Sequence, residues 1–159
     1  MFSQILKFFQ RKPTFCDGAI LYRRLIEPKA LGSALKICHL PDTFDNRFEV
    51  LALCAALKFE GEKNRHALER DFMAALITDL DNSFREQSLG DSSVKKHATN
   101  HAAAFYGRLR AYGRMHAGQE DAPTTLRRNL YGDTTTAVQE MALAQLLPQL
   151  KKSLKRIPN

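Results

Sequence analysis

The stretch that decides the fold of this chain is residues 41–60, PDTFDNRFEVLALCAALKFE. Asp42 or Thr43 follows the proline and can cap a helix, and an aspartate lies in the first turn, where the helix dipole favours negative charge. The centre, VLALCAAL, is apolar on every side rather than along one stripe, which is typical of a helix surrounded by its neighbours. We therefore predict a central core helix over residues 43–60.

Two longer amphipathic patterns follow this stretch. Residues 64–87 place Leu68, Phe72, Ala75, Leu76 and Leu80 on one helical face, and residues 94–116 align Val94, Ala98, His101, Phe105, Leu109 and Tyr112. The connection contains Leu89-Gly90-Asp91, in which a glycine can end one helix and the aspartate can begin the next. The pattern predicts an antiparallel helical hairpin near residues 64–116.

Helical periodicity continues through almost the whole chain of 159 residues. Strict apolar and polar alternation is absent, and β-branched residues are sparse beside Ala and Leu. We predict an all-α fold, a single compact domain of about six helices packed around the central one. We divide the chain into a basic amphipathic N-terminal segment (1–13), the helical domain (14–150) and a basic C-terminal tail (151–159).

Charge is distributed unevenly along the chain. The formal net charge is +7, yet residues 41–91 carry 11 acidic and six basic side chains. The excess of positive charge therefore lies on both sides of an acidic middle. It is typical either of ordinary solvated faces or of a surface for RNA, a ribosome or anionic lipid.

Asp79 falls inside the apolar face of the first hairpin helix. Folding the chain about residue 91 brings this carboxylate opposite residues 101–105. A buried carboxylate without a partner costs several kcal/mol or becomes protonated. We therefore predict that Asp79 pairs with a histidine of the second helix, such as His101, or with Arg108.

No pattern for catalysis or metal binding is found. His97 and His101 are four residues apart but lack the glutamate of a HExxH helix, and the three cysteines indicate neither a disulfide framework nor a zinc site. Phosphate-binding glycine loops and nucleophile elbows are also absent. The longest apolar run, residues 50–57, is too short to span a bilayer. We expect no enzymatic activity, cofactor or metal.

The side of the second hairpin helix opposite its apolar stripe carries Lys96, Ala103, Gly107, Arg110 and Arg114. Small residues let another backbone approach closely, and arginines supply hydrogen bonds or phosphate contacts. Gly107 costs roughly 1 kcal/mol in a helix interior relative to alanine, which suggests that its small size is used. One interpretation is a docking face for a partner helix or an RNA backbone. The other is that Ala103 and Gly107 pack against another helix of the same domain.

Four stretches resemble the ubiquinol-cytochrome c chaperone family. The most specific is LDNSFREQSLGDSSVKKHATNHAAAFYGRLRAY at residues 80–112; the others are LYRRLIEPKAL (21–31), LPDTFDNRFEVLALCAAL (40–57) and LRRNLYG (126–132). They occur in the expected order. Members of this family include assembly factors for the cytochrome bc complex, respiratory complex III. Because it lacks a long targeting extension, the chain resembles the short bacterial members of this family.

The resemblance implies a non-enzymatic assembly chaperone that binds newly made cytochrome b or a similar hydrophobic membrane subunit. It implies further candidate partners: a second assembly factor, the ribosome and an anionic membrane surface, with no specific DNA. The expected location is the cytoplasm, including the inner face of the cytoplasmic membrane, or the matrix side in a mitochondrion. The alternative is a basic helical module that binds RNA or ribosomes without a client.

The resemblance also assigns residues. As its structural signature we expect Asp42, Arg47, Phe48, Glu49, Asp79, Asp81, Arg85, Gly90, Asp91 and Phe105. As candidates for partner contact we expect Lys96, Tyr106, Gly107 and Arg108, which match the family, together with Arg110 and Arg114, which come from the outer face of the second hairpin helix described above.

Overall fold

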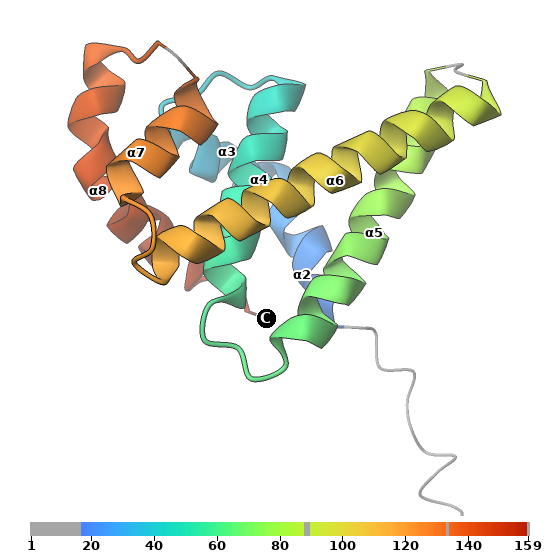
Figure 1. Ribbon diagram of the computed structural model, residues 1–159, viewed down its shortest axis with the longest axis horizontal. Helices are drawn as coiled ribbons and strands as arrows, with labels where there is room; N and C mark the ends of the chain where they lie inside the picture. Colours follow the sequence, from blue (N-terminus) through green and yellow to red (C-terminus); the bar gives the residue numbers. More distant parts are fainter. Residues whose placement is uncertain (1–16, 88–89, 133, 159) are drawn as a thin grey trace, which may run out of the picture.

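The computed structural model describes residues 17–87, 90–132 and 134–158 (Figure 1). Its elements are α2 (Asp17–Ile26), α3 (Pro28–Ile37), α4 (Phe44–Phe59), α5 (Arg65–Glu86), α6 (Asp91–His116), α7 (Ala122–Leu126), the π-helical turn η1 (Arg127–Tyr131) and α8 (Ala137–Leu154). Among these residues there is no strand. The all-α prediction is confirmed, and seven α-helices stand close to the expected six.

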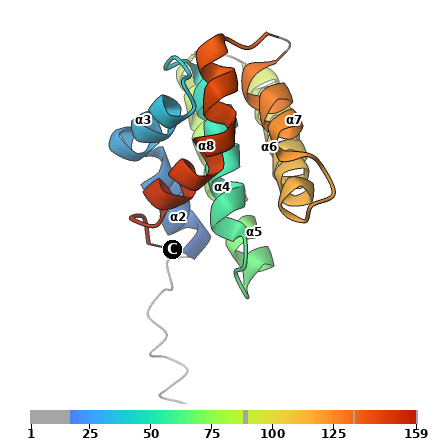
Figure 2. The ribbon, with the colours of Figure 1, turned by 90° about the vertical axis from the view of Figure 1, so that its left-hand side faces the viewer.

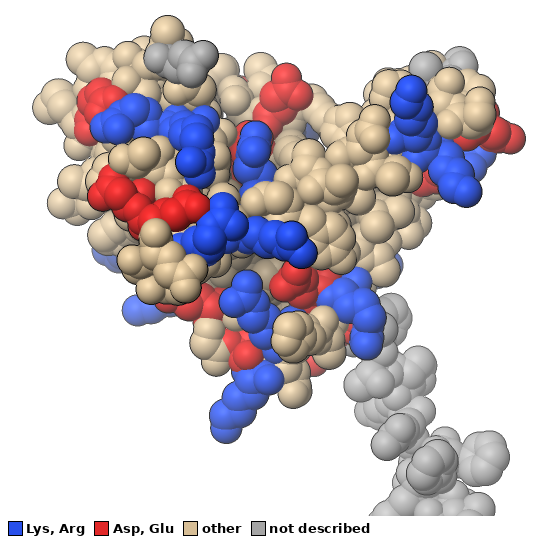
Figure 3. All heavy atoms as spheres, viewed as in Figure 1, with Lys and Arg blue, Asp and Glu red and all other residues tan. Residues whose placement is uncertain are grey.

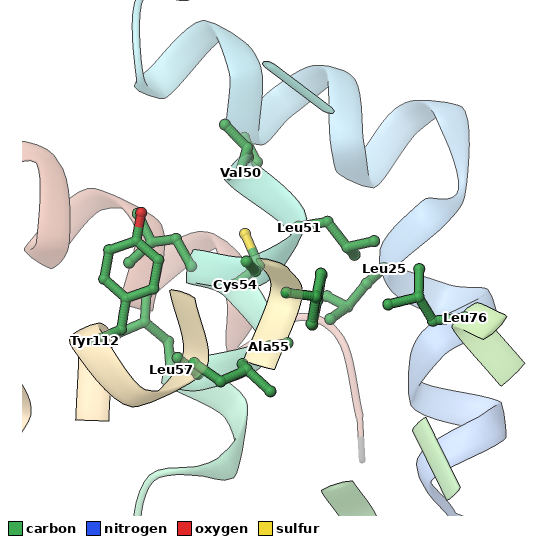
Figure 4. Close-up of a cluster of buried hydrophobic side chains, with 14 of the residues drawn as sticks. Leu25, Val50, Leu51, Cys54, Ala55, Leu57, Leu76 and Tyr112 are labelled. Carbon is green, nitrogen blue, oxygen red and sulfur yellow. The ribbon is translucent and has the colours of Figure 1, made fainter. Parts of the chain in front are cut away.

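Helix α4 is the centre of the domain, as predicted. The hydroxyl of Thr43 caps it by accepting a hydrogen bond from the backbone N of Asn46 at 3.3 Å. Every residue from 50 to 57 is buried. The helix has neighbours on more than one side, so an apolar stripe along one face would not be enough. In Figure 4, Leu57 lies on the side of Tyr112, whereas Leu51 points to the opposite side. Seen from the side, α4 lies between α2 and α6 (Figure 2).

Helices α5 and α6 form the predicted hairpin. They leave their connection as the two arms of a V, and α6 crosses in front of α4 (Figure 1). Helix α6 begins at Asp91, one turn before the predicted start at Val94. The extended backbone of Gly90 (φ −62°, ψ 150°) provides its N-cap. The hairpin places one long face of α6 on the surface of the domain.

Helix α2 packs along α5 at very short range. A Cβ atom added at Gly18 would collide with the carbonyl oxygen of Leu68 and the amide nitrogen of Phe72. Only a residue without a side chain allows this approach. The close contact brings the next turns of α2, including Tyr22, against the middle of α5.

Helix α8 closes the domain on the side of α3 and α4 and packs against both, whereas α7 packs against α6 (Figure 2). Residues 151–154 of the predicted tail continue α8, and Leu154 is buried. Beyond the helix, the Lys58 ammonium donates to the Ile157 carbonyl at 2.8 Å, and Arg24 donates to the Pro158 carbonyl at 2.8 Å. The last turns of the chain are thus held against α2 and α4. The predicted segment 1–13 lies outside the described residues.

Candidate functional site

The outer side of α6 is not covered by any described residue. Lys96, Ala103, Gly107, Arg110 and Arg114 are all exposed. A Cβ atom added at Gly107 would meet nothing within 4 Å. The interpretation that this helix packs Ala103 and Gly107 against another described helix is therefore not supported. The docking interpretation stays open.

Tyr106 lies on the same exposed side, with 41% of its surface accessible. We call Lys96, Ala103, Tyr106, Gly107, Arg110 and Arg114 the α6 face. Figure 3 shows that the middle of α6 is uncharged, with Lys and Arg side chains toward both of its ends. The surface is an uncharged strip with positive ends rather than a continuous basic one.

The positive charges of the α6 face are not equivalent. Lys96 and Arg110 form no ion pair with any residue that the structure describes. Arg114, in contrast, places its Nε 2.5 Å from Oε1 of Glu120. This hydrogen bond lowers the pKa of Glu120. Lys96 and Arg110 are thus the charges best placed for an outside partner.

Arg108 is turned inward, toward α4. Its Nε lies 2.7 Å from Oε2 and 2.8 Å from Oε1 of Glu49, whose side chain is only 16% exposed. The hydrogen bond to Glu49 raises the pKa of Arg108. Of the six residues expected to contact a partner, Arg108 is the one that already has a part-buried partner within the domain.

Other charged residues of the expected signature also pair with one another. Arg47 forms an exposed bidentate pair with Asp42. Arg85 places Nε 2.8 Å from Asp81 and Nη1 2.6 Å from Asp91, so that it joins the end of α5 to the start of α6. These charges therefore have partners within the domain, at exposed positions.

The pairing predicted for Asp79 is wrong. The carboxylate is exposed and lies beside the hydroxyl of Tyr22 on α2, while Arg108 is engaged by α4. Burial and the neighbouring Asp79 carboxylate raise the pKa of Tyr22 above its usual range. The reason is the tight packing of α2 on α5, which places Tyr22 next to Asp79. The prediction considered only residues of the two hairpin helices.

His101, the polar residue in the apolar stripe of α6, is placed among aromatic rings. Its ring centre lies 5.8 Å from those of Phe44 and Phe48 and 5.2 Å from that of Phe84. Its Nδ1 lies 2.9 Å from the carbonyl oxygen of His97 one turn earlier. Packing against these aromatic rings accounts for a histidine at the edge of the core. In the described part of the chain, no group of three His, Cys, Asp or Glu side chains could hold a metal ion.

An apolar hollow lies on another side of the domain, where α2, α3, α4 and α5 meet. It has a volume of about 280 Å³ and is lined by Tyr22, Ile26, Leu31, Phe44, Arg47, Phe48, Leu51, Leu76, Asp79, Leu80 and Ser83. We call it the α4–α5 groove. Phe44, at its edge, is 52% exposed. The groove can receive apolar side chains of another molecule.

Sequence reasoning did not find this groove. Its lining comes from four helices that are far apart in the chain, and most of these residues read as ordinary core positions. The one available signal was Phe44, a large aromatic residue in the first turn of a helix among charged neighbours. That position says nothing about which other helices surround it.

No helix in the described part of the chain is both long and apolar enough to cross a membrane. A family model described as ubiquinol-cytochrome C chaperone matches residues 36–158. The match includes α4, the α5–α6 hairpin, η1 and α8, and it begins after the stretch at residues 21–31. No curated protein and no solved structure matches the chain.

Proposed function

The chain belongs to the ubiquinol-cytochrome C chaperone family, and we propose that it assists assembly of the cytochrome bc complex by binding newly made cytochrome b or another hydrophobic membrane subunit. The role is one of binding and holding and requires no chemical step. We place it where such a subunit is made, at the inner face of the membrane, or on the matrix side in a mitochondrion.

The observation that carries the proposal is the contrast between two groups of expected residues. Signature charges such as Glu49, in a part-buried pair, and Arg85, in a surface pair, have ion-pair partners within the domain. Lys96, Tyr106 and Gly107 are exposed and have no evident role in packing. Exposed residues without a structural task are the better candidates for contact with a partner. We propose that the α6 face, with Lys96 and Arg110 at its charged ends, contacts the client or a second assembly factor.

The alternative is a module that binds RNA or a ribosome. Such a module is expected to show a continuous basic strip and little exposed apolar surface. Here Arg114 and Arg128 share Glu120, and Arg127 is paired with Glu140. Several arginines are thus neutralised, and the α4–α5 groove exposes Phe44. The balance favours a client with apolar surface, while the ribosome and an anionic membrane remain candidates for additional contacts.

Affinity purification from respiring cells tests the proposal. The tagged full chain is isolated after mild crosslinking, and bound proteins and RNA are identified by mass spectrometry and sequencing. We expect cytochrome b or another bc-complex subunit to be enriched over other membrane proteins. Enrichment of ribosomal RNA without any bc-complex subunit would support the alternative instead.

A further inference from the structure

The α4–α5 groove combines features that a docking site for an apolar segment needs. Leucines from α3, α4 and α5 form its floor, and Phe44 and Phe48 supply aromatic walls. A volume of about 280 Å³ lies below the range of pockets that enclose whole small molecules, but it accommodates one or two large apolar side chains. In protein interfaces such side chains serve as anchors and contribute most of the binding free energy.

The charges around the groove are predominantly negative. Asp79 lines it, and the exposed Asp45 and Glu27 are the sequence neighbours of two lining residues, Phe44 and Ile26. The exposed Arg23, which follows the lining residue Tyr22, is the one cation placed in the same way, so that the carboxylates outnumber it. Among the described residues, no lysine or arginine forms an ion pair with any of these three carboxylates. The surroundings thus attract positive charge.

The one cation that lines the groove does not offset this charge. Arg47 is held in a bidentate pair by Asp42. The acidic middle of the sequence, residues 41–91, supplies most of the groove. The positive α6 face and the α4–α5 groove are therefore surfaces of opposite electrostatic character.

We propose that the α4–α5 groove receives an apolar segment of the client that is flanked by lysine or arginine. Membrane-spanning segments of a newly made subunit have this chemistry, because Lys and Arg flank such segments on the side where the protein is made. Apolar side chains of the segment enter the groove beside Phe44, and a flanking cation approaches Asp79. The inference rests on the proposed function and adds the place and polarity of client binding.

Two synthetic peptides test the groove directly. Both contain the same short leucine–alanine helix; one carries two lysines at each end and the other two glutamates, and binding to the full chain is followed by fluorescence anisotropy. We expect the lysine-flanked peptide to bind more tightly at low salt. Asp79→Asn should reduce this preference by up to about fivefold, the range of an exposed ion pair. Equal affinity for both peptides would overturn the proposal.

Matched variants separate the groove from nonspecific adhesion. Phe44→Ala should weaken both peptides roughly tenfold, because it removes exposed aromatic area from the contact. Val138→Ala on α8 removes a comparably exposed apolar side chain, and Asp17→Asn removes an exposed carboxylate at the start of α2. Both control variants should bind like the wild type. Equal losses in Phe44→Ala and Val138→Ala would contradict the proposed site, provided that unfolding midpoints show all variants to be folded.

Copurification with the client tests the groove assignment and the proposed function separately. If wild-type protein retains cytochrome b and the Phe44→Ala, Asp79→Asn double variant loses it, the groove is the client site. If the double variant retains cytochrome b fully, the groove assignment is wrong and the proposed function stands. If wild-type protein retains no bc-complex subunit, the proposed function itself fails, whatever the peptides do.

Discussion

Arg108 of α6 and Glu49 of α4 form a part-buried ion pair, with Nε of the arginine 2.7 Å from Oε2 of the glutamate. The pair joins the central helix to the helix that carries the proposed contact face. Removal of one partner would leave the other charge without compensation in a site that water reaches only in part. The relationship therefore makes Arg108 a determinant of the domain's stability.

We predict that Arg108→Ala lowers the free energy of unfolding by roughly 1–2 kcal/mol, a reduced value because the arginine side chain is 38% exposed. Urea denaturation followed by far-ultraviolet circular dichroism measures this loss. Arg47→Ala is the control, since its pair with Asp42 is far more exposed. It should shift the midpoint little. Equal shifts in both variants would contradict the structural role of the Arg108–Glu49 pair.

Two glycines in helices should respond in opposite directions to alanine. Gly18→Ala should destabilise the domain by about 1–3 kcal/mol, the usual cost of overpacking, because α2 and α5 cannot keep their distance. Gly107→Ala should stabilise it by roughly 0.5–1 kcal/mol, because the added methyl meets only solvent and a helix-interior glycine is costly. Thermal unfolding of both variants measures the difference. A stabilised Gly18→Ala variant would show that the helices are not packed as described.

Substitutions on the α6 face should weaken partner binding without destabilising the domain. We predict that Lys96→Glu combined with Arg110→Glu reduces recovery of the client or of a second assembly factor at least several-fold without changing the unfolding midpoint. Lys36→Glu combined with Lys152→Glu, on α3 and α8, applies the same change of net charge at exposed positions elsewhere. Quantitative mass spectrometry of the purified complexes compares the pairs. Equal losses would mean that net charge, not this face, determines the association.

Acid should weaken the contact between η1 and α8. Oε1 of Glu140 accepts hydrogen bonds from Arg127 at 2.7 Å and Thr135 at 2.6 Å, and these lower the pKa of the carboxyl to about 2. Because the folded value lies below the ordinary value of 4.5, the stabilisation is complete above about pH 4.5 and is lost as the pH falls toward 2. Unfolding midpoints of the wild type and Glu140→Gln should therefore converge over this interval. A constant difference between the two proteins would rule out this linkage.

Local patterns were sufficient to predict the main elements. The all-round apolar stretch at residues 50–57 identified the central helix, because only a helix enclosed by others can bury every side. The periodicity on both sides of residue 91 identified the hairpin. These features depend on neighbours in sequence, and the structure places them where they were expected.

Tertiary relations were the part that sequence patterns could not supply. Asp79 was assigned to a buried pair from its position on a helical wheel, but its neighbour, Tyr22, comes from a helix that a glycine brings unusually close. The α4–α5 groove was missed for a similar reason, since leucines that line a groove and leucines that fill a core look alike in a sequence. Gly107, in contrast, could be singled out from the sequence, because a glycine inside a helix lowers the stability of that helix and no neighbouring residue explains its presence.

The central claim is that the protein is needed to assemble the cytochrome bc complex. The most direct measurement is the amount of spectroscopically detectable cytochrome b in membranes of a deletion strain, compared with the same strain carrying the gene on a plasmid. The account predicts a strong loss of the cytochrome b signal that the wild-type gene restores. Cytochrome b at the level of the parent strain would contradict it.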